Sequence, residues 1–394
     1  MISVEDATQR IVSALKPLDA ETVEIAEAAG RVLAEDAIAK ATQPPFPVSS
    51  MDGYAVRSTD VQTVPARLHV IGTSPAGHPF NGKVSEGEAV RIFTGGVVPD
   101  GADTIVIQEN TEADKTHVTV KSGAKSGQHI RRVGLDFTRG NVLLAKAKRL
   151  TARDLSLLAA ADIASVFVRR KPTIAFAATG DELSRPGEPR KPGGIVSSSG
   201  YGLAAMIENW GGIPRDLGIL PDDADAIASI ADEKADLLVT LGGASVGDHD
   251  LVQRALGPKG FALDFWKIAM RPGKPLIFGK LGDTPLLGLP GNPVSSFVCA
   301  ILFLQPAIAS MLGTNIMLPI RNAKLAVALA ANDARQDYLR ARTQVRDGEF
   351  FVEAFAVQDS SMLKILADAD SLIVRAPNAP HANPGETVEI LPLC

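Results

Sequence analysis

Acidic and basic side chains follow several predicted strands, and residues of these types could handle a phosphate ester. Glu182, Asp222 and Asp250 would repel a phosphate group unless a hard cation lay between them. Arg271 and Lys274 would attract the phosphate directly. This mixture of charges favours a magnesium-dependent site for a phosphate ester.

Glycine- and proline-rich turns occupy the same loops. The segments "TGDEL", "TLGGASVGDHD" and "LPGNPVSS" each join an apolar run to a helix start or to a polar side chain. Backbone N–H groups in such turns can point at an anion, and open parallel sheets bind ligands at the carboxyl ends of their strands. The turn residues expected at this site are Gly180, Gly242, Gly243, Ser245, Gly247, Pro290, Gly291 and Pro293.

Each acidic residue also has a structural interpretation. Asp181, Glu182, Asp222 or Asp223, taken alone, is more often a helix N-cap or first-turn acid than a ligand. Asp248 has even odds of a purely structural role, and the histidine beside it fits a turn better than a catalytic base. It is the convergence of several such loops on one sheet edge that favours a binding site.

Composition excludes some classes of function. The chain has 394 residues and a net charge of -5, which predicts neither a nucleic-acid-binding nor a membrane-binding surface. Cys299 and Cys394 fall in different predicted domains, so the sequence predicts no disulfide framework and a cytoplasmic location. The apolar segment 295–312 contains Gln305 and Pro306, which favour a buried core helix over a membrane span.

The elements that must position these residues predict an α/β plus all-β protein of four domains. Residues 1–40 and 141–170 predict a discontinuous helical domain, into which an all-β domain is inserted at 41–140. Alternating strands and helices over 171–315 predict a central doubly wound, mainly parallel sheet. Residues 316–394 predict a small C-terminal β-barrel.

Two helices are expected within the first 40 residues. Ser3 is the predicted N-cap of the first helix, whose apolar positions share one face and indicate a folded helix instead of a signal peptide. The second helix would carry apolar residues at helical spacing, namely Ile25, Ala28, Ala29, Val32 and Leu33.

Seven motifs occur together and in order along nearly the whole chain. They are "MDGYAV", "RIFTGGVVPDGAD", "RRVGLD", "TGDEL", "GGASVGDHD", "RPGKP" and "GLPGNPVS". With them the chain resembles the molybdopterin molybdenumtransferases, the MoeA and gephyrin E-domain family. The resemblance implies insertion of molybdate into adenylylated molybdopterin with Mg²⁺, release of AMP and formation of molybdenum cofactor.

The resemblance also implies an architecture and a set of roles. It implies a homodimer whose active site lies between the third domain of one subunit and the second domain of the other, which would supply Asp52, Thr94 and Asp136. In the third domain it implies that acidic residues handle metal or molybdate, that basic residues face the oxyanion and that prolines shape the pocket floor. The acidic residues are Glu182, Asp222 and Asp250, the basic residues are Arg271 and Lys274, and the prolines are Pro290 and Pro293. Arg340 and Ser361 of the last domain match the family more loosely.

Three residues depart from the family pattern. Ser199 stands where the family usually has asparagine, Leu241 where a serine commonly precedes the double glycine, and Arg271 where lysine is usual.

Two other functions stay open. The third domain alone also resembles the molybdopterin adenylyltransferases, and gephyrin-type E-domains also act as non-catalytic dimeric scaffolds. The adenylyltransferase is equally a candidate partner that delivers the adenylylated substrate.

Overall fold

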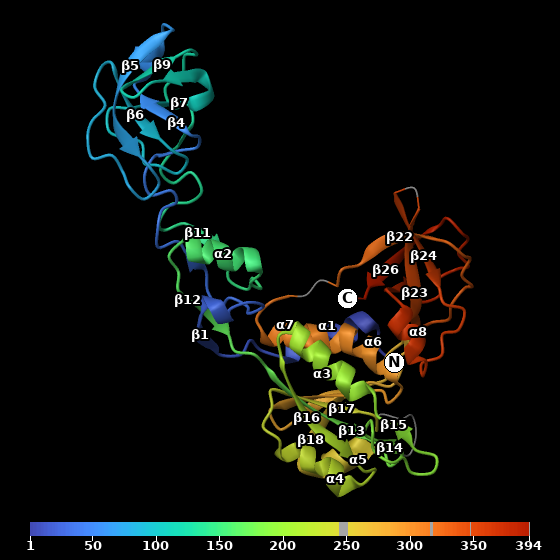
Figure 1. Ribbon diagram of the computed structural model, residues 1–394. Coiled ribbons are helices and arrows are strands. Elements are labelled where there is room, and N and C mark those ends of the chain that lie inside the picture. The colour runs from blue at the N-terminus through green and yellow to red at the C-terminus, as the bar shows by residue number, and fades with distance from the viewer. Residues whose placement is uncertain (244–250, 316–317, 347, 394) are drawn as a thin grey trace. The chain divides into compact units, whose positions relative to one another are not determined.

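The computed structural model describes residues 1–243, 251–315, 318–346 and 348–393. They form two compact units, which we call the α/β unit and the β-rich unit (Figure 1). The α/β unit comprises Met1–Glu21, Gly30–Ala34 and Val168–Cys394. The β-rich unit comprises Thr22–Ala29 and Glu35–Phe167.

A six-stranded sheet forms the centre of the α/β unit, in the order β16-β13-β17-β21-β20-β18. Its first four strands run parallel to one another, and β20 pairs antiparallel with both β21 and β18. The runs "IAFAAT" and "LLVTL" are buried throughout, as strands covered on both faces must be. The strands are β13 (Thr173–Thr179), β16 (Ile213–Leu220), β17 (Leu237–Leu241), β18 (Phe261–Trp266), β20 (Ile277–Leu281) and β21 (Thr284–Leu289).

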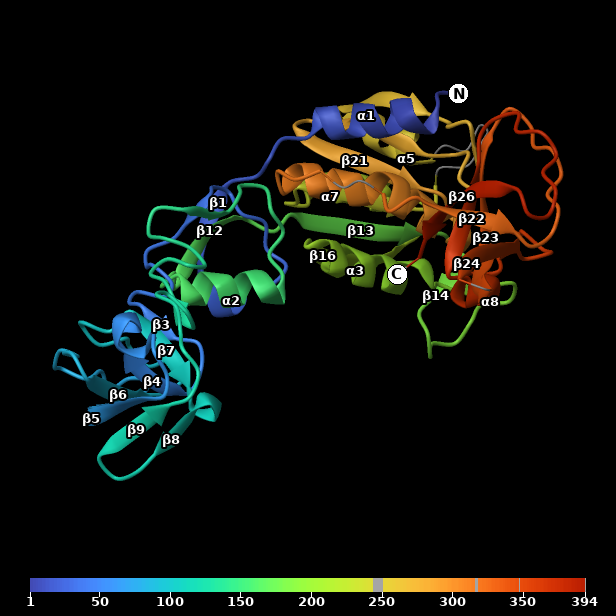
Figure 2. The same ribbon diagram turned by 90° about the horizontal axis from the view of Figure 1, so that it is seen from above.

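Helices cover both faces of this sheet (Figures 1 and 2). On one face, α1, α3, α6 and α7 bury Ile11, Leu203 and Val298 in one cluster, and on the other α4 and α5 bury Ile227 and Val252 in another. The predicted doubly wound sheet is therefore confirmed. The helices are α1 (Val4–Ala14), α3 (Ser199–Trp210), α4 (Ala224–Ala228), α5 (Leu251–Leu256), α6 (Pro293–Cys299) and α7 (Gln305–Met311).

The apolar segment near residue 300 is a core helix. Within the described residues one helix, Pro293–Met311, is long and apolar enough to cross a membrane, yet 72% of its most apolar window is buried inside the structure. A π-helical turn at Ala300–Leu304 joins α6 to α7. Pro306 has no N–H to offer to the Leu302 carbonyl, and the Thr8 hydroxyl of α1 donates to that oxygen at 3.4 Å. The predicted buried helix is thus confirmed.

A closed barrel completes the α/β unit. Five strands pair around a ring in the order β23-β24-β22-β26-β25, and β25 pairs with β23 again. The short strand β19 (Met270–Arg271), which comes from the loop after β18, adds to β23 in parallel. The predicted C-terminal β-barrel is confirmed. Its elements are β22 (Arg321–Leu325), β23 (Gln336–Arg346), β24 (Glu349–Ala354), α8 (Leu363–Asp368), β25 (Ser371–Arg375) and β26 (Thr387–Pro392).

A second six-stranded sheet forms the core of the β-rich unit, in the order β7-β4-β6-β5-β9-β8. Tyr54, Leu68 and Val118 belong to its buried cluster. The helix α2 (Ala152–Ala160) begins at a capping box in which Thr151 and Asp154 bond to each other's backbone N–H groups. The sheet strands are β4 (Gly53–Val56), β5 (Ala66–Ser74), β6 (Glu88–Ile92), β7 (Thr104–Ile107), β8 (Thr111–Ala113) and β9 (His117–Val120).

The second predicted helix of the first 40 residues is wrong. The segment forms short strands and a single 3-10 turn, Ile25–Glu27. Gly30 follows with φ +72, a left-handed conformation that ends a helix. Leu33 and Val32 are buried in an irregular stretch, so their helical spacing reflects burial alone. The first helix is confirmed, because the Ser3 hydroxyl caps α1 by accepting from the Asp6 N–H at 3.0 Å.

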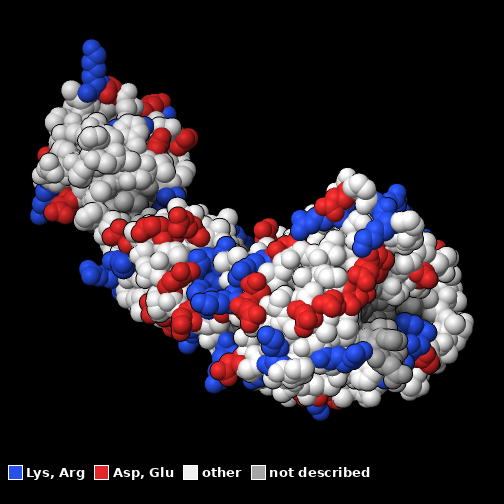
Figure 3. Space-filling model, turned by 90° about the horizontal axis from the view of Figure 1, so that it is seen from below, with Lys and Arg blue, Asp and Glu red and all other residues white. Residues whose placement is uncertain are grey.

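Several short strands lie outside the main sheets. They include two antiparallel pairs within the β-rich unit and one parallel pair after β13. The strands are β1 (Ala20–Glu24), β2 (Ala37–Ile38), β3 (Val48–Ser49), β10 (Ile130–Arg131), β11 (Val142–Leu144), β12 (Ser165–Arg169), β14 (Leu183–Ser184) and β15 (Ile195–Val196). On the face shown in Figure 3, Lys and Arg side chains are interspersed with Asp and Glu on both units.

Candidate functional site

Three strand ends of the central sheet lie close together. The Gly242 N–H donates to the Leu289 carbonyl at 3.1 Å, which joins the ends of β17 and β21. A Cβ on Gly242 would lie 2.9 Å from the Thr179 carbonyl oxygen at the end of β13, and one on Gly291 would lie 3.5 Å from the Gly242 Cα. The predicted convergence of Gly242 and Gly291 at the carboxyl edge is therefore seen in the described residues.

The loops after β13 and β16 bring two of the predicted acids to this edge. The Glu182 carboxylate folds against Gly180, where a Cβ would lie 2.6 Å from Oε2. The Asp222 N–H donates to Asp181 Oδ1 at 3.3 Å and so ties the two loops together. Both Glu182 and Asp222 are exposed. Asp223, in contrast, accepts from two N–H groups at the start of α4, which confirms the N-cap interpretation for that residue.

The acidic pair fits a magnesium ion that is also held by its substrate. Mg²⁺ in phosphate sites usually takes one or two carboxylates, several waters and phosphate oxygens. Glu182 and Asp222 are exposed carboxylates without an ion pair among the described residues, and no three His, Cys, Asp or Glu side chains of that part gather into a complete metal site. Asp250, the third predicted ligand, lies outside the described residues, as do Ser245, Gly247, Asp248 and His249.

The RPGKP loop holds the two predicted cations in different surroundings. The Arg271 guanidinium forms a hydrogen-bonded ion pair with Asp337 of β23, and its Nη1 lies 3.8 Å from Asp333 Oδ2. Lys274 makes no ion pair within the described ranges, and only its carbonyl is engaged, accepting from the Ile268 N–H at 2.9 Å. The two cations are thus not equivalent.

The loop before α6 contacts the barrel. The Asn292 side-chain amide donates to the Ser360 hydroxyl at 3.0 Å, and the Val294 N–H donates to the Ser360 carbonyl at 3.1 Å. Pro293 occupies the first turn of α6, while Pro290 is buried behind it. A barrel loop therefore borders the predicted turn of Pro290, Gly291 and Pro293.

Arg340 supports this barrel loop from inside. Its side chain is 1% exposed, and its guanidinium donates to the Asp359 carbonyl at 2.6 Å and to Gln358 Oε1 at 3.1 Å. Asp359 in turn accepts from the N–H and hydroxyl of Ser361 at 2.8 and 2.6 Å, and these bonds lower the pKa of Asp359. Arg340 is thus connected to Ser361 through the loop, while Ser361 itself is exposed.

In the β-rich unit the structure joins Asp52 to Thr94. Asp52 Oδ1 accepts from the Thr94 N–H at 2.7 Å and from its hydroxyl at 2.9 Å, which lowers the pKa of Asp52. The two residues meet because β4 and β6 pair with Gly53 opposite Ile92. Asp136 lies on another turn, where its N–H donates to the Gln43 carbonyl at 3.0 Å.

Sequence reasoning missed Arg91, which borders the Asp52 turn. Its guanidinium lies 5.1 Å from the ring centre of Tyr54 and 4.8 Å from that of Phe93, and it donates to the Gly53 carbonyl at 3.1 Å. The alternation of Arg91 and Phe93 with buried residues could have indicated that both side chains lie on the same face of the strand. Tyr54 itself is 8% exposed and belongs to the buried cluster of this sheet.

Two of the departures from the family pattern have different surroundings. Leu241 is 4% exposed and packs in the main core cluster, so its side chain points away from the open edge. Ser199 begins α3, beside a small pocket that Arg185, Ser197 and Tyr201 help to line.

Three family models match consecutive parts of the chain. The MoeA N-terminal region (domain I and II) matches residues 2–161. A probable molybdopterin binding domain matches residues 175–310. The MoeA C-terminal region (domain IV) matches residues 322–393. Together the matches follow the order of the sequence motifs.

Several named proteins are similar to this chain over nearly their whole length. The chain is 35% identical to a molybdopterin molybdenumtransferase of Haemophilus influenzae, covering 100% of this chain and 98% of that protein. It is 33% identical to one of a Nostoc species, with 100% and 94% covered. The crystal structure of a molybdopterin biosynthesis MoeA protein from Pyrococcus horikosii superposes with a TM-score of 0.84 at 29% identity, covering 100% and 99% of the two chains.

Proposed function

Because the chain belongs to the molybdopterin molybdenumtransferase family, we propose that it inserts molybdate into adenylylated molybdopterin, releases AMP and forms molybdenum cofactor. The observation that carries the proposal is the edge where Gly242 and Gly291 meet. The loops that leave β13 and β16 at the same edge carry two exposed carboxylates, Glu182 and Asp222. Open parallel sheets bind ligands at the carboxyl ends of their strands, so this edge suits an anionic ligand held through a cation.

The reaction needs positive charge at two places. Molybdate is a dianion and the dithiolene of molybdopterin is anionic, so both must be neutralised as they approach each other. The adenylate that leaves also carries negative charge. Lys274, which has no ion pair within the described residues, can turn its ammonium group toward these anions. Cleavage of the phosphoanhydride to AMP then makes insertion effectively irreversible, and no covalent intermediate with the protein is needed.

Magnesium belongs to this proposal as well. Glu182 and Asp222, with Asp250, would hold the ion. When bound, Mg²⁺ would neutralise the phosphate oxygens of the adenylylated substrate. The protein's own part is to present these carboxylates at the sheet edge, which the bond from the Asp222 N–H to Asp181 helps to do.

A homodimer is part of the proposal too, with Asp52, Thr94 and Asp136 reaching the site from the partner subunit. Exposed apolar residues support an interface in the β-rich unit. Ile38 of β2 and Val142 of β11 pair across two strands and are 51% and 56% exposed. The molybdopterin adenylyltransferase is the partner from which the adenylylated substrate would come.

The decisive assay is AMP release from adenylylated molybdopterin with Mg²⁺ over a molybdate titration. We expect release that depends on molybdate and falls by at least about 100-fold in Glu182→Ala and in Lys274→Ala, because each removes a charge that the reaction uses. Lys280→Ala is the matched control. Lys280 pairs with Pro285 on β21, at the opposite end of that strand from the site, and its loss should leave the rate unchanged.

The outcome also separates the alternatives. If the folded protein binds the nucleotide but releases no AMP at any molybdate concentration, the insertion reaction is refuted. AMP transfer from ATP to molybdopterin by the same preparation would then identify an adenylyltransferase.

A further inference from the structure

Arg271 is attached to the barrel by both its backbone and its side chain. The short strand β19 pairs with β23 so that Arg271 lies opposite Asp337. Its guanidinium donates to Asp337 Oδ2. The RPGKP loop is therefore fastened to the barrel at the point where the chain turns toward Lys274.

Asp337 is a buried carboxylate that receives this guanidinium. The residue is 2% exposed, and Oδ1, the carboxylate oxygen that Arg271 leaves free, has no hydrogen-bond partner within the described residues. A buried carboxylate needs a paired charge, because removal of one partner leaves an uncompensated ion in a medium of low polarity. The position of Arg271 is thus fixed by the burial of Asp337.

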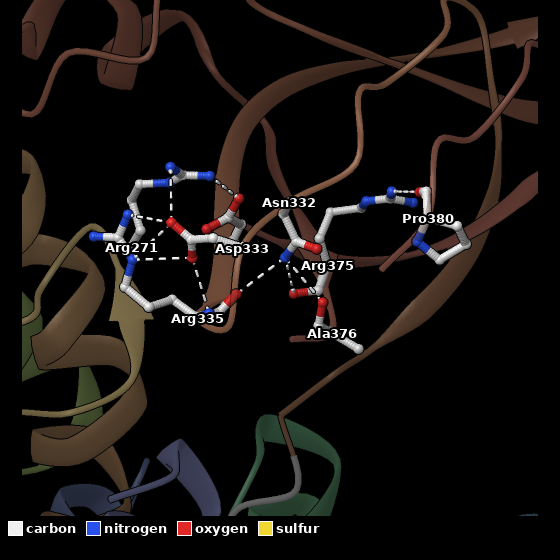
Figure 4. A network of polar contacts seen from close by, with 8 residues as sticks. Arg271, Asn332, Asp333, Arg335, Arg375, Ala376 and Pro380 are labelled. Carbon is white, nitrogen blue, oxygen red and sulfur yellow. Dashed lines mark hydrogen bonds and ion pairs between the residues drawn. The ribbon is translucent and has the colours of Figure 1, made fainter. Parts of the chain in front are cut away.

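A second carboxylate holds the other side of the guanidinium. Asp333 lies 3.8 Å from Arg271 Nη1 and is bonded to Arg335 (Figure 4). The bonds from Arg335 lower the pKa of Asp333 to about 2, so Asp333 stays ionised at any pH where the protein functions. Asn332 anchors this turn by donating to the Arg335 carbonyl at 3.0 Å and to the Ala376 carbonyl at 2.9 Å.

The arginine side chain is suited to this arrangement. A planar guanidinium offers donors in a fixed fork and can reach two carboxylates at once, whereas a lysine ammonium is a single compact charge. Arg271 pairs with Asp337, and Asp333, which Arg335 also holds, lies 3.8 Å from Arg271 Nη1, so the guanidinium is directed toward the barrel. Lys274, three residues later, has no acidic partner among the described residues.

We propose that Arg271 is a positioning residue that fastens the RPGKP loop to the C-terminal barrel through Asp337 and Asp333, and that Lys274 alone among the two cations faces the oxyanion. The second half of this statement rests on the proposed function. The first half does not, because a fastening can be measured without any substrate.

The test compares Arg271→Gln with the double variant Arg271→Gln/Asp337→Asn. The single variant leaves the buried Asp337 carboxylate unpaired, and we expect the Tm of the α/β unit to fall by roughly 10 °C. The double variant replaces the ion pair by two amides that can still bond to each other. It should recover most of the lost Tm, and its KM for molybdate should lie within about 3-fold of the wild-type value. In Lys274→Gln the Tm should stay unchanged and the KM for molybdate should rise by at least about 10-fold.

Lys324→Gln is the control for the effect of charge loss in the same barrel. It breaks an exposed ion pair with Glu349, in which Nζ lies 2.6 Å from Oε1, and should change neither the Tm nor the KM. If Arg271→Gln is too unstable to purify, Asp337→Asn and the double variant alone provide the comparison. Asp337→Asn leaves Arg271 charged at the loop and should keep the KM for molybdate close to the wild-type value.

Two results would overturn the inference. An unchanged Tm in Arg271→Gln would show that Arg271 fastens nothing. A double variant that regains its Tm but keeps a molybdate KM raised as far as that of Lys274→Gln would show that Arg271 binds the oxyanion itself. If no folded variant, the wild type included, releases AMP in response to molybdate, the proposed function fails, while the Tm comparison still decides whether the fastening exists.

Discussion

At the scale of single residues, hydrogen bonds set the charge state of Asp52. Its carboxylate is open to solvent, yet the N–H and hydroxyl of Thr94 both donate to Oδ1 and hold its pKa below the ordinary value of 3.8. The bond therefore favours the folded state above that value, and this contribution is lost as the pH falls through the lowered pKa. At neutral pH Asp52 is an anion with a fixed orientation, which suits the role proposed for it in the shared site.

Thr94→Val should raise the pKa of Asp52 only part of the way to its ordinary value. The substitution removes the hydroxyl donor but keeps the N–H, and the N–H bond is the larger cause of the shift. An NMR titration of the side-chain carboxyl groups measures the change. Asp114 is the internal control, because the N–H groups of Thr116 and His117 lower its pKa and neither bond involves Thr94. A midpoint of Asp52 that does not move would contradict the assignment of the hydroxyl as donor.

At the residue scale, Arg340 has a supporting role inside the barrel. Arg340 is buried and reaches Ser361 through Gln358 and Asp359. Its loss would leave the loop that borders Asn292 without internal support. The described contacts of Arg340 are therefore those of a residue that supports a loop.

At the scale of elements, glycines determine how closely the strands approach. A Cβ on Gly53 would lie 2.0 Å from the Val106 carbonyl oxygen, a distance at which the β4–β7 pairing cannot survive unchanged. Gly53 is the glycine of the MDGYAV motif, so the motif has a structural cause that is independent of Asp52. Gly53 and Asp52 are neighbours in this six-residue motif.

Substitutions at two glycines should have opposite effects. Gly53→Ala should destabilise the β-rich unit by about 3 kcal/mol, because the added carbon meets backbone that cannot move aside. Gly202 is exposed in α3, and a Cβ there meets nothing within 4 Å, so Gly202→Ala should stabilise the α/β unit by about 0.5–1 kcal/mol. Chemical denaturation followed separately for each unit measures both changes. If both variants changed the free energy of unfolding in the same direction, the predicted difference between the two glycines would be refuted.

At the scale of the whole molecule, the proposed site draws residues from two subunits. The β-rich unit presents Asp52 with Thr94, and the α/β unit presents Glu182, Asp222 and Lys274. Each unit has its own buried core, so each can present its residues as a rigid surface. A site shared between subunits predicts that two inactive variants can restore each other.

Refolding or coexpressing Asp52→Ala with Glu182→Ala should recover about a quarter of the wild-type rate of AMP release, because half of the dimers are mixed and one of their two sites is intact. The matched control mixes Glu182→Ala with Lys274→Ala. Both of those residues come from the α/β unit, so every site keeps one defect and no activity should return. A mass measurement by light scattering first establishes that dimers form and exchange. Exchange without any recovery in the first mixture would refute the shared site.

The sequence alone determined the order of the parts and the chemistry of the central loops. Apolar runs bounded by turns predict the buried strands β13, β17 and β21, and apolar residues at helical spacing predict α1. Both patterns can be seen in the sequence because they extend over only a few residues. The prediction of a second helix was wrong because the apolar spacing in that segment does not come from a helix. Apolar spacing near Val32 and Leu33 reports burial, and Gly30 with φ +72 excludes the helix.

Only the tertiary structure determines which charged side chains form ion pairs. Arg271 and Asp337 are 66 residues apart, and nothing in either local sequence indicates that β19 adds to the barrel beside β23. The same holds for Arg340, whose burial follows from the closure of the barrel and not from its neighbours in the chain. An ion pair depends on which surfaces meet after folding. The sequence could therefore predict two cations in the RPGKP loop, but not that one of them is already paired.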